Sequence, residues 1–417
     1  MQQKNLWQVT SKEKITFSYL KKSITTDLVV IGGGFTGCSA ALSAAKNGLS
    51  VTLVDKKIGY GGSGRNVGLV NAGLWMPPEK VESILGLDAG VKLNKALATA
   101  PDLVFSLIDN YEINCSANRS GTLHCAHSKK GLKDIHLRFK QLSERGAELE
   151  LLDKQQTQER IGSSKFFGSL FNKKAGIINP LDYCLGLARV AKSYGVNIYE
   201  STIATNIESI NNDWLIQTAE GTIKAKMLLI ATNAYQKPIE GLNPSKYTSV
   251  QYFQVATKSL PSDLVKSVLP NGEGCWDTAS VMSSFRLDAD NRLIIGGIGN
   301  LGHSASKIHT NWARRKIESL FPHLKNIDIE FSWHGRIAMT GDHIPKILRL
   351  GSNAYSVFGY SGRGIGPGTY FGKAVSECLI SGDETSLPVD PLDYYQEPFS
   401  KIKAGFIEFS ATASHLL

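Results

Sequence analysis

Apolar and polar residues alternate with recognisable periods along most of this chain, and the clearest pattern lies near the N-terminus. Residues 28–31 form an apolar run that leads directly into glycines; an alanine-rich segment follows as far as Gly48, and a second apolar run ends at Asp55. Short apolar runs bounded by glycine, with a longer helical segment between them, are typical of buried parallel strands. The pattern predicts a strand, a tight turn, a helix and a second strand over residues 27–55.

Farther along the chain, the periodicity is first mainly helical and then mainly extended. We expect helices at residues 89–111 (divided at Pro101), 131–146, 180–195, 309–320 and 369–380. We expect strands at residues 119–128, 196–200, 206–210, 213–219, 222–225, 227–231, 249–258, 280–287, 292–297, 329–340 and 354–359, of which 206–225 form a three-stranded meander.

These elements predict an α/β fold (α+β overall), in which a Rossmann-like domain with a parallel sheet is interrupted by a domain with an antiparallel sheet. A chain of 417 residues is long enough for two such cores. The expected parts are an N-terminal arm (1–26), a discontinuous nucleotide-binding domain (27–75, 150–235 and 330–385), an interrupting substrate domain (76–149 and 236–329) and a C-terminal tail (386–417).

Three glycines at the first predicted turn have the spacing Gly32-x-Gly34-x-x-Gly37. In dinucleotide-binding folds, one such glycine permits the turn, the next lets the backbone approach a pyrophosphate, and the third lets helix and strand pack closely. The helix N-terminus offers unpaired N–H groups to the phosphates. Asp55 ends the second strand, where a carboxylate can bind ribose hydroxyls. The motif predicts a dinucleotide, without distinguishing FAD from NAD.

Two further glycine-rich stretches, residues 58–68 and 359–368, are far apart in the sequence. Glycine-rich loops lose much backbone entropy on ordering, and a bound ligand helps to explain why such a loop is kept. The alternative for residues 58–68 is a flexible surface loop. We expect the N-terminal and C-terminal glycine-rich stretches to meet around one ligand.

The composition, with 42% hydrophobic and 20% charged residues, is that of an ordinary globular protein. The net charge is +9, but the basic residues are scattered and form no patch typical of nucleic-acid binding. No zinc-site spacing occurs among the six cysteines, so no metal site is expected; in His124-Cys125-x-His127, alternation puts neighbouring side chains on opposite faces of a strand. With neither a signal peptide nor an integral membrane segment, a cytoplasmic protein is expected.

Together these motifs resemble the D-amino-acid oxidase-like superfamily of FAD-dependent amine and amino-acid oxidoreductases, nearest the gamma-glutamylputrescine oxidase branch. The resemblance covers about residues 20–385. It rests on six stretches in the same order: GGGFTGCSAALSAAKNG, IGYGGSGRNVG, INPLDYCLGLARVAKSYGVNIYE, LLIATNAY, WHGRIAMTGDHIP and GYSGRGIGPGTYFG. The later motifs imply FAD rather than NAD.

The resemblance also implies which residues contact FAD. Pyrophosphate contacts come from the first motif, ribose contacts from Asp55, and an adenine contact from the backbone of Ala204 or, alternatively, Ile203. Lys56 either contacts the ribose or is plain surface. The implied set is Gly32, Gly34, Phe35, Thr36, Gly37, Asp55, Lys56, Ser63, Gly64, Arg65, Asn66, Gly68, Ala204, Tyr360, Gly362, Arg363, Gly364, Ile365 and Gly366.

The chain departs from sarcosine-oxidase relatives at several site positions. The cysteine that binds flavin covalently in those relatives falls at Gly335, so non-covalent FAD is expected. The lysine that holds a substrate carboxylate falls at Gly366, and the motif histidine is Arg363. A lysine associated with oxygen activation falls near Ile294, so the resemblance does not by itself imply oxidase activity.

The resulting hypothesis is FAD-dependent oxidation of a C–N bond in a small-molecule amine or amino acid. A hydride passes from the substrate's α-carbon to flavin N5, the imine hydrolyses, and O2 or another acceptor reoxidises the flavin. Alternative functions are a flavin dehydrogenase that passes electrons to a quinone or protein, modification of a tRNA, and a non-catalytic flavin-binding scaffold. The sequence identifies neither the substrate nor an oligomeric state.

Several polar and aromatic residues are candidates for the substrate site, each with a structural alternative. An imidazole titrates near neutral pH, so His334 is either a proton acceptor or a structural histidine. Arginine forks bind carboxylates, so Arg65, Arg336 and Arg363 either hold an acidic substrate group or form structural ion pairs. The candidate pocket walls, or else core residues, are Tyr252, Phe253, Trp276 and Phe285.

Overall fold

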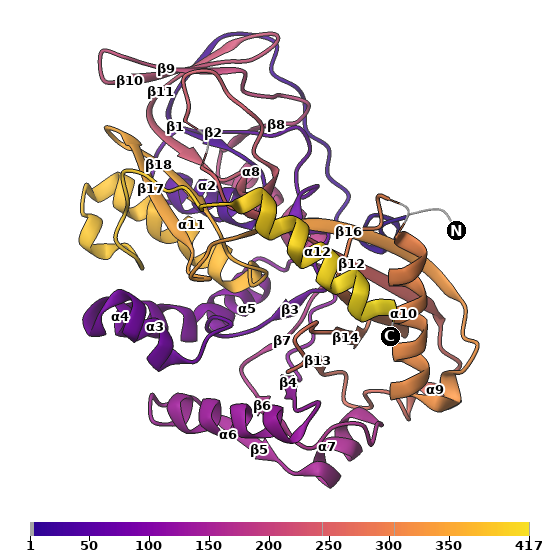
Figure 1. Cartoon of the computed structure of the whole chain (residues 1–417). Coiled ribbons are helices and arrows are strands. Elements are labelled where there is room, and N and C mark those ends of the chain that lie inside the picture. Colours follow the sequence, from indigo (N-terminus) through magenta and orange to yellow (C-terminus); the bar gives the residue numbers. More distant parts are fainter. Residues whose placement is uncertain (1–3, 244, 304, 417) are drawn as a thin grey trace.

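Two eight-stranded sheets organise the computed structural model, which describes residues 4–243, 245–303 and 305–416. The first sheet lies in the upper part of Figure 1, and the second runs from β16 and β12 at middle right down to β5 near the bottom. A two-stranded sheet pairs β3 (Leu69–Val70) with β7 (Gly176–Ile177). In the part of the chain that the structure describes, no helix is both long and apolar enough to traverse a bilayer.

The first sheet is the predicted Rossmann-like sheet. Its main strand order is β17-β18-β11-β1-β2-β8, in which β18, β11, β1, β2 and β8 are parallel and β17 is antiparallel. The predicted strand, turn, helix and strand are β1, α2 (Phe35–Lys46) and β2. The strands are β1 (Ile24–Ile31), β2 (Val51–Val54), β8 (Asn197–Tyr199), β9 (Asn206–Ile210), β10 (Asp213–Gln217), β11 (Thr222–Ile230), β17 (Lys346–Gly351) and β18 (Ala354–Phe358).

The predicted meander needs one correction, because its third strand and the predicted buried strand are the single strand β11. In its first half, Lys224 and Lys226 are exposed and alternate with buried residues; from Met227 onward every residue is buried. The change from one covered face to two covered faces alters the apolar pattern without ending the strand.

Helices cover one face of the first sheet, and the meander strands β9 and β10 help to cover the other. The covering helices are α2, α8 (Pro180–Ser193) and α11 (Ile365–Ser381). The helix α11 begins four residues before the predicted start at residue 369. Pro367 is tolerated in the first turn because N–H groups there have no partner within the helix.

The second sheet has the order β16-β12-β15-β14-β13-β4-β6-β5 and is antiparallel except for the pair β13–β4. Buried side chains of β12, β14 and β15 pack with α10 on one face. The strands are β4 (Thr122–Cys125), β5 (Leu149–Leu152), β6 (Ser169–Asn172), β12 (Thr248–Ser259), β13 (Gly274–Asp277), β14 (Ser284–Leu287), β15 (Arg292–Ile298) and β16 (Ile329–Met339).

The remaining helices surround this framework. The helix α5 begins beside Pro101, as predicted, whereas α12 lies in the predicted tail and was not expected. The helices are α1 (Leu6–Thr10), α3 (Pro78–Leu85), α4 (Leu87–Ala98), α5 (Ala100–Asn110), α6 (Lys129–Ser143), α7 (Lys154–Ile161), α9 (Ser262–Val265), α10 (Ser306–Leu320) and α12 (Ser400–Leu416).

The strands β5, β6 and β16 belong to the second sheet, although their residues fall within segments predicted for the nucleotide-binding domain. We propose that the domain division follows the sheets. On that division, β5, β6 and β16 join the substrate domain.

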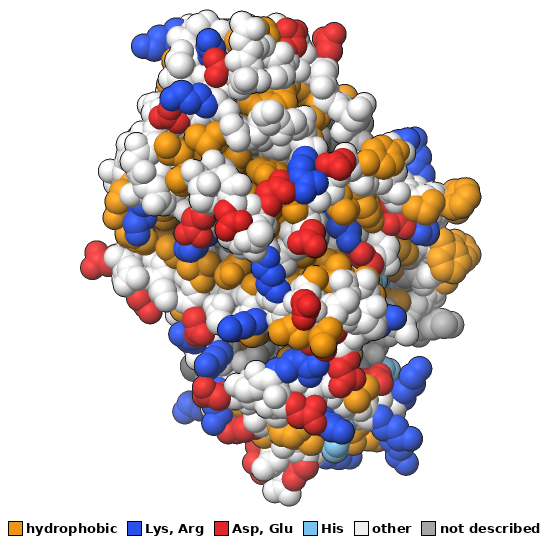
Figure 2. Space-filling view, turned by 90° about the vertical axis from the view of Figure 1, so that its left-hand side faces the viewer, with side chains coloured by type: hydrophobic (Ala, Val, Ile, Leu, Met, Phe, Trp, Pro, Cys, Tyr) orange, Lys and Arg blue, Asp and Glu red, His pale blue; other side chains and the backbone are white. Residues whose placement is uncertain are grey.

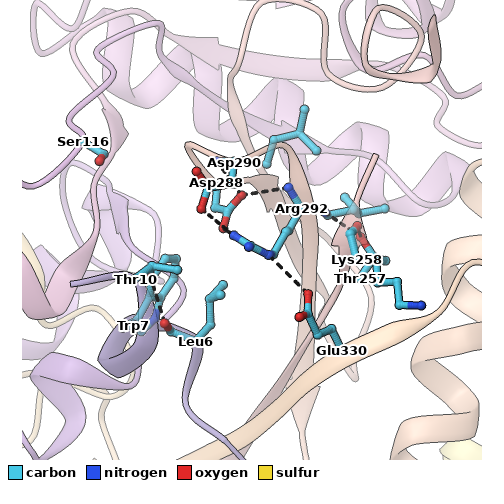
Figure 3. Close-up of polar contacts among 12 residues, drawn as sticks. Leu6, Trp7, Thr10, Ser116, Thr257, Lys258, Asp288, Asp290, Arg292 and Glu330 are labelled. Carbon is cyan, nitrogen blue, oxygen red and sulfur yellow. Dashed lines mark hydrogen bonds and ion pairs between the residues drawn. The ribbon is translucent and has the colours of Figure 1, made fainter. Parts of the chain in front are cut away.

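An ion-pair network at the start of β15 connects two strands that are not neighbours in the sheet (Figure 3). Arg292 contacts Asp288 at 3.1 Å and Asp290 at 2.6 Å, and its Nε lies 3.5 Å from the Glu330 carboxylate of β16. The strand β12 lies between β15 and β16. The network therefore ties the β14–β15 turn to the sheet edge.

The helices α2 and α11 approach one another through Gly372. A Cβ added there would overlap the carbonyl oxygen of Thr36 and lie 3.1 Å from the Ala40 nitrogen. We expect Gly372→Ala to lower the free energy of unfolding by about 1–3 kcal/mol through overpacking. Gly405→Ala is the matched helical control, because its Cβ would meet nothing within 4 Å. It should raise stability by up to about 1 kcal/mol through helix propensity. Urea unfolding measures both, and equal effects would contradict this account of the contact.

Candidate active site

A cavity of about 510 Å³ is lined by residues from both sheets. Its first-sheet side is formed at the ends of three parallel strands, by Ile31, Val54 and Ala231. The opposite wall comes from the second sheet and includes Tyr252, Gln254 and Trp276. Ligands of open parallel sheets bind at these carboxyl ends of the strands, so the fold itself directs a ligand to this cavity.

The first glycine motif forms a cradle that is free of side chains at the start of α2. Gly32 has φ of +111°, and a Cβ there would lie 2.8 Å from the Ala231 backbone. The N-terminus of α2 has no side-chain cap at Gly34 and no acidic residue in its first turn. The Phe35 N–H donates to Ser63 Oγ at 3.1 Å. Apart from this bond to Ser63, no side chain caps the start of α2, and such a helix N-terminus is suited to an anionic diphosphate.

Asp55 lies at the end of β2 beside this cradle. Its carboxylate accepts hydrogen bonds from the backbone N–H of Gly33 at 2.6 Å and of Lys57 at 3.3 Å. Burial raises the pKa of Asp55. A glycine cradle, an open helix start and an adjacent carboxylate together fit the diphosphate and ribose of FAD.

The N-terminal and C-terminal glycine-rich stretches meet, as predicted. The hydroxyls of Thr36 and Tyr360 lie 2.7 Å apart, and Ser39 donates to the Thr369 carbonyl at 2.7 Å. The Gly359 N–H donates to Asn233 Oδ1 at 3.0 Å. One cavity therefore has walls from segments more than three hundred residues apart.

Most of the predicted cofactor residues line the cavity. Both alternatives for the adenine contact, Ala204 and Ile203, do so. The predicted residues that line it are Gly32, Gly34, Phe35, Thr36, Asp55, Lys56, Ser63, Arg65, Asn66, Ala204, Tyr360, Gly362, Arg363, Gly364, Ile365 and Gly366. Gly37, Gly64 and Gly68 are not among the lining residues. A Cβ on any of these three would overlap a backbone carbonyl oxygen, so they serve close packing of the chain.

One row of side chains crosses the second sheet on the cavity face. Register pairs Gln254 with Gly296, Gly296 with Ser284, and Ser284 with Trp276. Because directly paired residues of antiparallel strands share a face, this row forms the wall. Tyr252 also lines the cavity, as predicted for it and for Trp276.

The other two predicted wall residues, Phe253 and Phe285, belong to the core on the α10 face, so that interpretation was wrong. Alternation also puts His124 and Cys125 on opposite faces of β4. The rings of His124 and Trp276 stack with centroids 3.4 Å apart, whereas Cys125 packs in the α10-face core. No group of three or more potential metal ligands occurs among the described residues.

Arg363 is the most deeply buried of the three candidate arginines. Its guanidinium lies 4.6 Å from the ring of Trp75 and 4.5 Å from that of Trp276. Nη1 donates to the Ala72 carbonyl at 2.8 Å, whereas Nε and Nη2 are buried without a hydrogen-bond partner. Burial, and then repulsion by Arg138, lower its pKa well below the usual value. Arg363 is therefore a buried cation that has unused donors and lines the cavity.

The other two arginines lie over tyrosine rings on the cavity lining. The Arg65 guanidinium is 3.8 Å from the Tyr60 ring, and that of Arg336 is 4.6 Å from the Tyr235 ring. The Arg336 side chain is exposed. Water can therefore accept hydrogen bonds from the exposed Arg336 guanidinium, whereas the Arg363 guanidinium is buried.

His334 does not line the cavity, which corrects its place among the candidates. On β16 it pairs with Phe253, whose side chain belongs to the α10-face core, whereas Gly335 and Ile337 line the cavity. Burial, followed by the charge of Arg65, lowers the pKa of His334. The motif resemblance located the strand, but at His334 the strand faces the core that contains Phe253.

Trp75 and Gln254 are among the cavity residues that were not identified from the sequence. Trp75 Nε1 donates to the Ser361 carbonyl at 2.6 Å and forms one side of the Arg363 site. Gln254 has a buried side-chain oxygen without a partner. Its position two residues after Tyr252 on one strand was the available signal, because alternate residues share a face.

Comparison with known proteins agrees with this geometry. Residues 27–378 match the model of the DAO family, described as FAD-dependent oxidoreductase. The chain is 31% identical over 368 residues to "Probable oxidoreductase OrdL" of Haemophilus influenzae, covering 86% of this chain and 84% of that protein. It is 30% identical over 370 residues to Gamma-glutamylputrescine oxidoreductase of Escherichia coli, covering 88% and 86%.

A solved structure, L-proline dehydrogenase from P. horikoshii, superposes with a TM-score of 0.72. The match covers 88% of this chain and 98% of that one at 22% identity. At that identity, the likeness shows the shared fold.

The position of Asp55 leads to a test of cofactor binding. We expect Asp55→Asn to weaken FAD binding about ten- to hundredfold, because a charged hydrogen-bond acceptor is worth about 1.5–3 kcal/mol. Asp27→Asn is the control, since Asp27 lies within β1, does not line the cavity, and bonds Ser50 and Lys226. Flavin fluorescence during titration of the apoprotein measures both affinities. Equal affinities in the wild type and Asp55→Asn would exclude the proposed ribose contact.

Gly335 leads to a test of how the flavin is attached. It has no thiol, and the six cysteines are buried. We expect acid precipitation of the yellow holoprotein to leave all flavin absorbance in the supernatant. Absorbance that stays with the washed protein pellet would show a covalent bond.

Proposed function

This chain belongs to the DAO family of FAD-dependent oxidoreductases, and on that premise we propose that it oxidises a C–N bond in an amine or amino acid that carries an acidic group. FAD is its cofactor. The names of relatives, among them gamma-glutamylputrescine oxidoreductase and glycine oxidase, support a nitrogen-containing substrate. The observation that carries the acidic group is the unpaired guanidinium of Arg363.

Arg363 supports an anionic substrate because its own surroundings do not neutralise it. A buried charge is costly unless it is paired and hydrogen-bonded, and an arginine fork matches a carboxylate with two parallel hydrogen bonds. Nε and Nη2 form one side of that fork, and both lack a partner. The indoles of Trp75 and Trp276 hold the guanidinium. We infer that the substrate's acidic group binds there.

Gln254 supports a second polar contact on the same wall. Its unpaired side-chain oxygen is a hydrogen-bond acceptor, and we propose that it receives an N–H of the substrate amine. Gln254 lies on β12 and Trp276 on β13, which is the third strand along from β12 in the sheet. At the usual strand spacing the two strands are about 14 Å apart. This separation favours a substrate whose acidic group and amine are several bonds apart.

When bound, FAD would supply the acceptor of the two electrons and the hydrogen removed from the C–N bond, and water would convert the imine product to a carbonyl compound and an amine. The chain's residues bind and orient the substrate and exclude water from it. Burial raises the pKa of Tyr252, and its hydroxyl contacts Ser284 Oγ and the Gly296 carbonyl. With His334 outside the cavity, we propose that the amine arrives neutral and needs no protein base.

A dehydrogenase is the second candidate, and the surroundings of Ile294 favour it. The resemblance puts the lysine of sarcosine-oxidase relatives near this position, and here Ile294 is buried in an apolar cluster with Trp7 and Trp333. No cation from that position is available to promote reaction with O2. Hydrogen peroxide production measured against dye reduction separates the two activities.

The substrate proposal is tested by anaerobic flavin bleaching. The panel contains polyamine derivatives with and without an acidic group, N-methyl amino acids, D-amino acids and cyclic imino acids. We expect Arg363→Met to raise KM for acidic substrates about a hundredfold, as expected for two lost charged hydrogen bonds, and to change KM for neutral analogues little. Arg336→Met is the exposed control and should leave both values nearly unchanged.

Two outcomes would contradict the proposal at different levels. If Arg363→Met affects acidic and neutral amines equally, the acidic-group assignment is lost while amine oxidation stands. If no member of the panel bleaches the flavin of the folded holoprotein, amine oxidation itself is lost, and a flavin-binding scaffold becomes the better account.

A further inference from the structure

The helix α12 carries large apolar side chains on its outer surface. At its N-terminus and along its length, five such residues are 65–73% exposed: Phe399, Ile402, Phe406, Phe409 and Leu416. With about 3.6 residues per turn, these positions fall within a stripe roughly 100° wide, and Ala413 falls in the same stripe. We call these six residues the outer stripe. Scattered exposed apolar residues are normal, but a continuous row of them marks an interaction site.

The inner face of α12 is held in place by specific contacts. Glu408 accepts a hydrogen bond from the Asn300 N–H at 3.0 Å, and the Nδ1 atoms of His309 and His415 are 2.8 Å apart. The His415 ring stacks on Trp312 at 4.1 Å. These contacts set the rotation of the helix, so the outer stripe cannot turn toward the core.

The surroundings of the stripe identify the kind of partner. The helix crosses the front of the molecule in Figure 1, and this side forms the right-hand edge of Figure 2, where hydrophobic side chains protrude. Lys401 and Lys403 are the exposed lysines of α12; Lys403 is ion-paired with the buried Glu397, and the one acidic residue of the helix, Glu408, faces inward. The chain as a whole has a net charge of +9. A protruding aromatic stripe with basic neighbours is the pattern of a helix that lies in a membrane interface.

We propose that α12 docks this protein on the surface of an anionic membrane, with the outer stripe buried at the boundary between headgroups and acyl chains. A bilayer accepts protruding side chains without a matching groove. A second copy paired along the same stripe is the alternative occupant, and the light-scattering measurement below separates it from a membrane. Lys401 and the positive net charge of the chain add electrostatic attraction to acidic lipids.

Docking on this side brings the membrane next to the flavin cavity. A groove of about 250 Å³ beside α12 is lined in part by Phe406 of the outer stripe. Met339 and His343 line both this groove and the main cavity. The proposal does not depend on which substrate the enzyme oxidises.

The test is sedimentation of the flavin-loaded protein with sucrose-filled vesicles of pure phosphatidylcholine or with 30% phosphatidylglycerol. We expect binding to the anionic vesicles that weakens in high salt. Phe406→Ser with Phe409→Ser should lower the partition coefficient at least tenfold and leave flavin absorbance and Tm unchanged. The control pair is Leu87→Ser with Phe167→Ser, two exposed apolar residues elsewhere, and should bind like the wild type. Lys401→Glu should weaken binding chiefly at low salt.

Three results would overturn the proposal. The wild-type protein stays in the supernatant with both kinds of vesicle, or the Phe406/Phe409 variant binds as well as the wild type. In the third, size-exclusion chromatography with light scattering shows a dimer that this variant converts to a monomer, which assigns the stripe to a second copy. Unchanged flavin absorbance in the variant separates all three from loss of the fold.

Discussion

The structure depends on the contact between the first turn of α2 and the C-terminal glycine-rich stretch. At this contact, the Thr36 hydroxyl meets that of Tyr360 at 2.7 Å, and Gly372 packs against the Thr36 backbone. Both ends of the family motif series are thereby held against one cavity. Because a Cβ at Gly372 would overlap the Thr36 carbonyl, this approach requires a residue without a side chain. At the start of α2, Gly32 and Gly34 likewise carry no side chain and leave the helix N-terminus open to a diphosphate.

The second sheet supplies the opposite wall, and the period of two along its strands determines which residues reach the cavity. Tyr252 and Gln254 face the cavity, whereas Phe253 between them packs in the α10 core. On β16, His334 is not among the lining residues, whereas its neighbour Gly335 is. The chemistry of the wall is therefore mainly aromatic and neutral, and Arg363 reaches the cavity as a buried cation from the loop before α11.

That cation links binding to stability. Two of its nitrogens have no partner, and desolvation opposes its charge. An anion that binds to the folded protein satisfies those donors, and any ligand that binds only the folded state also stabilises it. A site of this kind has a stability cost without ligand, which is common where groups are arranged for function rather than for packing.

The sequence by itself determined the nucleotide-binding unit, the FAD family and a set of cofactor residues, most of which line the cavity. Those features depend on local spacing: glycines where the backbone must turn or approach a ligand, and apolar runs where strands are buried. It did not determine Trp75, Gln254 or the membership of β16 in the second sheet, nor did it predict α12. Pairing between distant strands and the face that each side chain takes decide these features. Only the tertiary structure shows that Arg363 lies against two indoles without an acidic partner, because Trp75, Trp276 and Arg363 come from three segments far apart in the sequence.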